Sequence, residues 1–446
     1  MSLPTPPSVQ KLQTALHAKA KGAPQFRFYA LYDKVYRADV LREAWKRCRT
    51  NGGAPGIDRQ TFRDIEQYGV PRWLGEVTEE LRKKTYRPQP VRRTFIAKGD
   101  GKQRPLGIPT IKDRVVQTAV LLVLEPIFEA DFPAEQYAYR PDKSALDAVN
   151  HVYRLLQQGH TEVVDADLSG YFDTIPHAEL MKSVARRVSD KSMLHLIQMW
   201  LDAPVEVRAA DGRVQRTTRN RDEGRGTPQG APISPLLANL YMRRFVLGWQ
   251  ALGYEQRLQA RIVNYADDFV ICCRGTAEQA AAAMRSIMGR LKLTVNESKT
   301  HVCRVPEASF DFLGYTFGRR YSPRTGRAYV GSQPSAKKVR KLCGTISELT
   351  TRRTTWQDPE ELVGRLNSKL RGWAGYFRLG SVSKAYRAVH QHACRRLRRW
   401  LKVKHQAPGR GTTRYPDEYL QQTLGLIRLP DMTRTFPWAT ACATRQ

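Results

Sequence analysis

Apolar residues follow two kinds of spacing along the chain, and together they predict a mixture of helices and strands. Residues 112–128 repeat apolar side chains at helical spacing, with Val115, Val116, Ala119, Leu122 and Val123 on one face. From residue 331 onwards the pattern is again helical, and the polar positions are mostly Lys and Arg. We therefore expect one long helix that ends near residue 128 and a basic helical region in the last third of the chain.

Three other segments favour strands. Residues 161–168 read as one apolar strand, and residues 92–98 and 104–108 read as a strand pair joined by a Gly99-Asp100-Gly101 turn. Residues 261–273 alternate well enough for a hairpin with Asp267 and Asp268 at its turn. An antiparallel sheet with helices behind it predicts an α+β fold.

Several local signals mark where helices begin. Residues 226–232 form a loop, after which Ser234 is expected as the N-cap and Pro235 as the first helical residue. Thr276-Ala277-Glu278-Gln279 fits a capping box that opens a helix to about residue 291. The first forty residues read as a loose basic segment leading into helix, and glycines and a proline break the chain at residues 51–56.

Composition narrows the class of protein. The chain has 446 residues and a net charge of +32, which points to a nucleic-acid partner. No run of eighteen apolar residues exists, so we expect no spanning helix and no membrane partner. Seven cysteines without a C-x-x-C pair argue against a disulfide framework and a structural zinc site. Because no secretory pattern opens the chain, we expect a cytoplasmic protein.

The positive charge is concentrated in one region. Residues 331–405 carry eighteen Lys and Arg against four acidic residues, whereas residues 406–446 are nearly balanced. Aromatic residues alternate with these cations, among them Trp373, Tyr376, Tyr386 and Trp400. Helices with one apolar and one cationic face can pack together and still contact phosphates, so this region predicts an RNA-binding bundle. A solvated charged face is the alternative.

Three carboxylates carry the candidate chemistry. Asp167 ends the predicted strand 161–168, and Asp267 and Asp268 occupy the turn of the predicted hairpin 261–273. Carboxylates brought to one sheet edge need a cation to stay ionised, and two Mg²⁺ ions held by such oxygens are what nucleotidyl transfer requires. The alternative is that the Asp pair simply makes a tight turn.

The neighbouring motifs favour catalysis, because in this setting the sequence resembles reverse transcriptases, and more narrowly the proteins encoded by bacterial group II introns. Tyr265-Ala266-Asp267-Asp268 is similar to the Y-x-D-D box of the family, and residues 167–175 resemble the strand with the first metal-binding Asp. Residues 226–230 and 234–239 resemble the loop and helix that support the template and the incoming nucleotide. Residues 98–109 resemble the fingers hairpin, residues 51–58 the N-terminal block, and residues 312–315 the primer-gripping turn.

The resemblance implies a role for each matching residue at the metal site. Asp167, Asp267 and Asp268 would be catalytic and would bind Mg²⁺, and the backbone carbonyl of Leu168 would also contact a metal ion. This would be an RNA-directed DNA polymerase that extends a DNA primer with deoxynucleotides on an RNA template.

Further residues are implied in nucleotide binding. Lys98 and Arg104 would fold over the triphosphate, and Lys299 would lie beside the departing pyrophosphate. Phe172 would exclude a 2′-hydroxyl under the sugar, with its neighbour Tyr171 as the alternative gate. Gln229 would hydrogen-bond near the nascent base pair.

The basic third resembles the maturase, or thumb, segment of the family, which implies binding of the parent intron RNA to assist splicing and mobility. The residues expected to contact RNA are Arg371, Arg395, Arg396, Arg398, Arg399 and Lys402.

We expect a right-hand polymerase with four parts. These are a basic extension (1–44), fingers and palm (45–330), a helical thumb (331–405) and a small nucleic-acid-associated unit (406–446). We expect no His- and Cys-rich nuclease domain, because the 446 residues hold no such cluster, and in this the sequence resembles the group IIC type. Two other functions stay open: a stand-alone relative serving phage defence or DNA repair, and a splicing factor with little polymerase activity.

Overall fold

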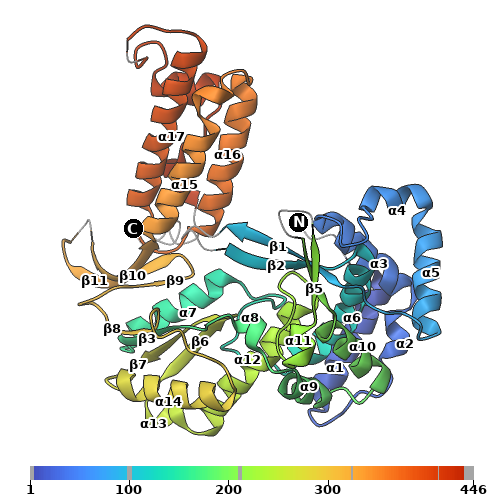
Figure 1. Ribbon diagram of the computed structural model, residues 1–446. Coiled ribbons are helices and arrows are strands. Elements are labelled where there is room, and N and C mark those ends of the chain that lie inside the picture. Colours follow the sequence, from blue (N-terminus) through green and yellow to red (C-terminus); the bar gives the residue numbers. More distant parts are fainter. Residues whose placement is uncertain (1–4, 98–102, 209–212, 323–324, 410, 436–446) are drawn as a thin grey trace.

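The computed structural model describes residues 5–97, 103–208, 213–322, 325–409 and 411–435. Two sheets with their helices form a broad base, and a bundle of long helices stands on one side of it (Figure 1). The N-terminal helices are α1 (Pro7–Gly22), α2 (Tyr32–Val35), α3 (Ala38–Asn51), α4 (Phe62–Tyr68) and α5 (Val70–Arg82).

The N-terminal segment is packed into the protein, so the expectation of a loose extension was wrong. Helix α1 lies against α6 (Ile111–Glu129), the long helix that the apolar spacing predicted. Val9 and Leu16 of α1 are buried, and Gln13 donates a hydrogen bond to the Leu122 carbonyl at 3.0 Å. An apolar stripe within a basic sequence is enough to dock this helix.

The fingers sheet has the strand order β2-β1-β4-β5. Strands β1 (Val91–Ala97) and β2 (Gln103–Ile108) pair antiparallel, which confirms the predicted hairpin, although its turn lies outside the described residues. Strand β4 (Val205–Arg208) runs parallel to β1, and β5 (Val214–Thr217) forms the edge. This sheet projects beside the N-terminal helices (Figure 1).

The palm sheet has the order β6-β7-β3-β8, and all neighbours are antiparallel. Val164 and Ala166 of β3 point into one core and Val163 points into another. Because side chains alternate along a strand, Asp165 and Asp167 share the face of Val163. The strands are β3 (Glu162–Asp167), β6 (Arg261–Tyr265), β7 (Asp268–Cys273) and β8 (His301–Arg304).

Helices cover both faces of the palm sheet. Helix α7 (Ala145–Gln157) belongs to the core of Val163, and α12 (Ser234–Ala251) and α14 (Ala277–Arg290) belong to the core of Val164. The shorter helices are α8 (Tyr171–Thr174), α9 (His177–Ala185), α10 (Lys191–Leu201), α11 (Arg219–Asp222) and α13 (Tyr254–Arg257).

Two predicted helix starts were wrong in detail. Ser234 is the first residue of α12 and Ile233 is the N-cap, because a preceding turn, in which Ser234 N–H bonds Ala231 O, already brings the chain into helical geometry. Thr276 is the N-cap of α14 but forms no capping box. Its hydroxyl donates to Leu258 O, and Glu162 of β3 accepts the first helical N–H instead, from Ala277 at 3.2 Å.

A three-stranded sheet joins the palm to the helical bundle. It has the order β11-β10-β9, with β9 (Phe310–Phe312), β10 (Tyr315–Tyr321) and β11 (Ala328–Pro334). The Tyr315 hydroxyl donates to Tyr376 O at 2.6 Å, and the Tyr376 hydroxyl donates to Leu313 O at 2.8 Å. These reciprocal bonds fix the foot of the bundle to the turn between β9 and β10.

The bundle itself consists of α15 (Ala336–Leu349), α16 (Pro359–Tyr376) and α17 (Ser383–Lys404), with a 3₁₀ turn η1 (Arg352–Thr354) at its distal end. The segment after residue 405, expected as a separate unit, shares this core through Leu420 and Leu426. Asn367 of α16 donates to Gly425 O at 2.8 Å. That segment holds a π-helical turn η2 (Tyr419–Thr423) and a 3₁₀ turn η3 (Leu429–Thr435).

None of the helices in the described ranges has the length and apolar character that crossing a bilayer requires.

Candidate functional site

Two of the predicted carboxylates lie directly opposite each other at one edge of the palm sheet. Asp167 is the last residue of β3, Asp268 is the first residue of β7, and the two are register partners in the antiparallel pair. Directly opposed side chains on adjacent strands lie within contact distance of each other. The sheet therefore brings together residues that are about a hundred positions apart in sequence.

Asp267 stands beside this pair in the tight connection from β6 to β7. The connection needs a left-handed residue, and Ala266 takes it with φ 59°. Asn264 is fully buried and its side-chain amide donates to Ala266 O at 2.8 Å. This hydrogen bond stabilises a backbone conformation that costs free energy for a non-glycine residue.

The segment after α14 supplies the partners of Asp167. Asn296 donates its side-chain amide to Asp167 Oδ2 at 3.1 Å, and its backbone N–H bonds Asp167 O at 2.9 Å. Lys299 Nζ lies 2.9 Å from the same Oδ2. Asp167 is thus held on one side by residues of the 292–300 segment and faces Asp268 on the other.

Loss of hydration and, after it, neighbouring negative charges raise the pKa of two carboxylates at this edge. The Asp268 side chain still reaches solvent, but the surrounding protein reduces its hydration. This loss of hydration, together with the negative charges of Asp267 and Asp167, raises the pKa of Asp268 to about 6. Loss of hydration, together with the charges of Asp268, Asp311 and Asp167, raises the pKa of Asp165 to about 7. The edge therefore has a surplus of negative charge that a cation would relieve.

The chemistry of these side chains fits a hard divalent cation. Carboxylate oxygens are the ligands that Mg²⁺ and Mn²⁺ prefer, and the pKa of Asp268 stays raised even though Lys299 pairs with Asp167 beside it. Among the described residues, no three His, Cys, Asp or Glu side chains converge closely enough to hold a metal without further ligands. Substrate oxygens would have to complete such a site. The Leu168 side chain is buried and apolar, so its backbone carbonyl is the group of this residue that could bind a metal ion.

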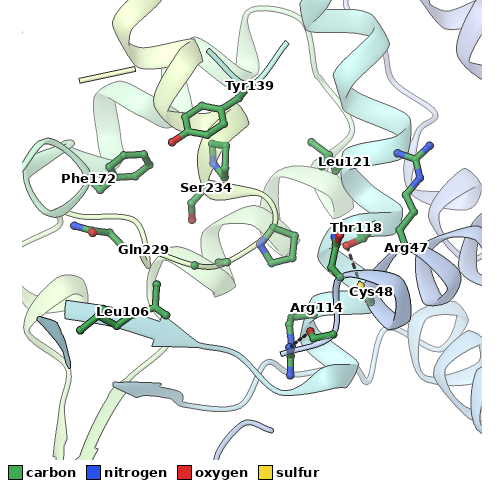
Figure 2. Close-up of a pocket in the computed structure, with 17 residues that line it drawn as sticks. Arg47, Cys48, Leu106, Arg114, Thr118, Leu121, Tyr139, Phe172, Gln229 and Ser234 are labelled. Carbon is green, nitrogen blue, oxygen red and sulfur yellow. Dashed lines mark hydrogen bonds between the residues drawn. The ribbon is translucent and has the colours of Figure 1, made fainter. Parts of the chain in front are cut away.

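Beside this edge, a cavity of about 820 Å³ opens between the fingers sheet, α3, α6 and the 229–235 loop. Phe172 and Gln229 lie on one side of it and Leu106 of β2 lies beneath (Figure 2). The neighbour of Phe172, Tyr171, is turned into the core instead, and its hydroxyl donates to Ala238 O at 2.6 Å. Of the two candidate gates, Phe172 is the one that lines the cavity.

The loop that carries Gln229 is held tightly against β2. Gly107 N–H donates to Gln229 O at 2.6 Å, and a Cβ on Gly230, which has φ 110°, would come within 2.6 Å of Gly107 O. Gln229 donates its side-chain amide to Asp173 at 3.0 Å. Gly230 is therefore required both by its positive φ and by the close approach of the loop to β2.

Two predicted nucleotide contacts cannot be placed. Lys98 lies outside the described residues, and Arg104 belongs to β2 but its side chain lies outside the described part.

The predicted RNA-binding cations of the bundle fall into two groups. Arg371, Arg395 and Arg399 are exposed and Lys402 is partly exposed. Arg396 instead bonds Ser347 O and Thr350 O, each at 2.9 Å, at the end of α15. The sixth, Arg398, bonds Tyr415 O at 2.8 Å and pairs with Asp417 at 2.5 Å.

Sequence reasoning missed two residues that shape the site, Asn264 and Asn296. Each lies next to a motif that was recognised, directly before Tyr265 and three residues before Lys299. An asparagine just ahead of a tight Asp-Asp turn was the available signal for Asn264, because its side chain readily bonds a nearby turn carbonyl.

Two family models match this chain. The family model described as "Reverse transcriptase (RNA-dependent DNA polymerase)" matches residues 96–317, and the model described as "Group II intron, maturase-specific domain" matches residues 339–415. The first begins near the end of β1 and includes the palm sheet with its three carboxylates, and the second covers most of the helical bundle.

Two relatives cover most of the chain. "Protein YkfC" of Escherichia coli K12 is 32% identical over 378 residues, which are 76% of this chain and 96% of that protein. "Group II intron-encoded protein LtrA" of Lactococcus lactis subsp. cremoris is 27% identical over 440 residues, 79% of this chain and 71% of that protein. A solved structure, "Partial Cas6-RT-Cas1--Cas2 complex", matches 58% of this chain and 41% of its own at 22% identity, with a TM-score of 0.35.

Proposed function

Because the chain belongs to the family of group II intron-encoded reverse transcriptases and maturases, which are RNA-directed DNA polymerases, we propose that it extends a DNA primer on an RNA template by two-metal catalysis with Mg²⁺. The observation that carries this proposal is the direct opposition of Asp167 and Asp268 at the palm edge, with Asp267 in the adjoining turn. Carboxylates arranged in this way leave oxygen atoms free for metal ions and substrate phosphates together.

In this proposal Asp167, Asp267 and Asp268 hold the metal ions, with the Leu168 carbonyl as a further ligand. Bound Mg²⁺ would supply the charge that favours ionisation of the primer 3′-hydroxyl and neutralises the leaving pyrophosphate. Asn296 keeps the Asp167 carboxylate oriented at 3.1 Å. Lys299, which pairs with Asp167, would supply a positive charge beside the leaving phosphates.

The cavity holds the nucleotide. Phe172 lies beneath the sugar, where its ring leaves no space for a 2′-hydroxyl, and Gln229 hydrogen-bonds at the nascent base pair. Lys98 and Arg104 bind the triphosphate. The packing of the 229–230 loop against β2 supports this assignment, because a fixed loop fixes the position of the base pair.

The helical bundle binds the parent intron RNA and assists its splicing. Its exposed cations Arg371, Arg395, Arg399 and Lys402 support this role. Arg396 and Arg398 contribute indirectly by holding the ends of neighbouring segments. A group II intron in the DNA that flanks the gene would supply that RNA.

Primer extension tests the polymerase proposal. The purified full chain, given a DNA primer annealed to an RNA template, should extend it with deoxynucleotides in Mg²⁺ and stop when EDTA is added. Extension that continues at the same rate after chelation would contradict metal-dependent catalysis. For the maturase role, the chain should accelerate splicing of the flanking intron RNA at a Mg²⁺ concentration where the RNA alone is slow. An unchanged splicing rate would contradict that role.

A further inference from the structure

The helical bundle extends away from the palm (Figure 1). A further cavity lies where α15 ends, between η1 and α17. Its volume is about 510 Å³. No acidic residue is among the described residues that line it. These are Thr350, Thr351, Arg352, Arg396, Arg399, Trp400 and Val403.

Three arginines converge here without an opposing charge. Arg396 is held by three hydrogen bonds, to Ser347 O, Thr350 O and Thr350 Oγ1. The guanidinium groups of Arg352 and Arg399 are exposed and bond no other group in the described part of the chain. Burial and the nearby charges of Arg399 and Arg395 lower the pKa of Arg396. One oriented arginine and two unpaired ones are suited to an anion with several oxygens.

An exposed tryptophan, Trp356, follows η1 in the segment that joins α15 to α16. Trp356 is 79% exposed, which is unusual for so large an apolar side chain. Its backbone is nevertheless fixed, because Lys404 Nζ donates to the carbonyls on either side, Thr355 O at 3.0 Å and Gln357 O at 2.9 Å. The turn is also tied to the cavity, since Trp400 Nε1 donates to Thr354 Oγ1 at 3.1 Å.

We propose that this distal cavity binds a backbone phosphate of a single-stranded RNA loop, and that an unpaired base of the same loop stacks on Trp356. The inference rests on the proposed RNA-binding role of the bundle and names the site and the RNA feature it recognises. Bases inside a duplex are already stacked, so a fixed, exposed indole selects unpaired ones. Arg352, Arg399 and Thr351 at the cavity supply donors for the phosphate next to that base, and Arg396 adds positive charge behind them.

Binding of the full chain to a hairpin RNA with a single-stranded loop tests this. Trp356→Ala should weaken binding by about fivefold or more, the usual effect of losing one stacked base, and Trp356→Phe should retain most of the affinity. Arg352→Ala combined with Arg399→Ala should weaken binding and make the dependence of log K on log salt shallower by about 1.4, for two lost single-strand contacts. A blunt duplex of the same stem should show neither effect.

Arg353→Ala is the matched control, because Arg353 is an exposed neighbour of Arg352 that does not line the cavity. It should leave affinity and salt dependence nearly unchanged. If Trp356→Ala and the double arginine variant bind the hairpin as tightly as the unsubstituted chain, the inference is wrong. Primer extension on a short primer–template, measured on the same preparations, separates this failure from failure of the polymerase proposal, because extension at the full rate would leave that proposal standing.

Discussion

Lys299 Nζ lies 2.9 Å from Oδ2 of Asp167, so a residue 132 positions away in the chain forms an ion pair with the proposed metal-binding carboxylate. The same oxygen accepts a hydrogen bond from Asn296. In the proposed mechanism, Lys299 and a metal ion would compete for this oxygen, and the amine would then be available to the pyrophosphate. The ion pair would thereby link the binding of metal to the neutralisation of the leaving group.

Replacing Lys299 by Met should separate these two effects. The KM for the deoxynucleotide should rise about tenfold or more, because a charge-assisted contact to the phosphates is lost. Mg²⁺ should bind the nucleic-acid-free protein at least as tightly as before, because the amine no longer competes for Asp167. Steady-state primer extension and titration calorimetry measure the two quantities. A weaker affinity for Mg²⁺ would contradict the competition.

The sugar gate gives a second prediction. Phe172→Ala should raise ribonucleotide incorporation relative to deoxynucleotide, because it opens the cavity wall under the sugar. Tyr171→Phe is the control, since it removes the hydrogen bond to Ala238 O without altering the cavity. It should lower the unfolding free energy by about 1 kcal/mol and leave the selection unchanged. Primer extension with both nucleotide types in competition measures the selection. If Phe172→Ala selects deoxynucleotides as strongly as the unsubstituted chain, Phe172 is not the gate.

A third prediction concerns the turn between β6 and β7, which holds Asp267. Asn264→Ala removes the donor that bonds Ala266 O and leaves this carbonyl without it in the interior. The unfolding free energy should fall by about 1–3 kcal/mol, and kcat should fall more than KM rises, since the turn that positions Asp267 loosens. Denaturant unfolding and primer extension provide the readouts. A variant with full kcat would show that the turn keeps its geometry without Asn264.

The arginines of α17 should differ in their effect on stability according to the contacts they make. Arg396→Ala removes three hydrogen bonds to the end of α15 and should lower the melting temperature. Arg395→Ala removes an exposed contact to His392 and should leave the melting temperature nearly unchanged while it weakens RNA binding. Thermal unfolding and RNA titration test both. Equal melting temperatures for the two variants would contradict this difference.

Local patterns predicted the elements of the fold well. The hairpin of β1 and β2, helix α6 and the strand carrying Asp167 each depend on spacing within a few residues, and the structure has all three. The capping box at Thr276 failed because Glu162, more than a hundred residues earlier, bonds the helix start instead. Such contacts between distant segments leave no mark in the local sequence.

The same limit applies to the site. The motifs predicted which carboxylates belong together, but the support of Asp167 by Asn296 depends on a bridge between the strand end and the 292–300 segment. The charge of residues 395–399 predicted a cationic face as a whole. Which of these arginines are exposed depends on the position of the end of α15 and on the position of the segment near Asp417. Tertiary packing sets both positions.

The most direct test of the polymerase assignment is the Asp267→Asn variant, which keeps the shape of the side chain and removes its charge. Primer extension on an RNA template should slow by at least about a hundredfold, as expected when electrostatic stabilisation at the reacting phosphate is lost. Binding of the same variant to RNA should persist, because the helical bundle is unchanged. Extension by Asp267→Asn at the rate of the unsubstituted protein would contradict the central claim that this palm edge is the catalytic centre.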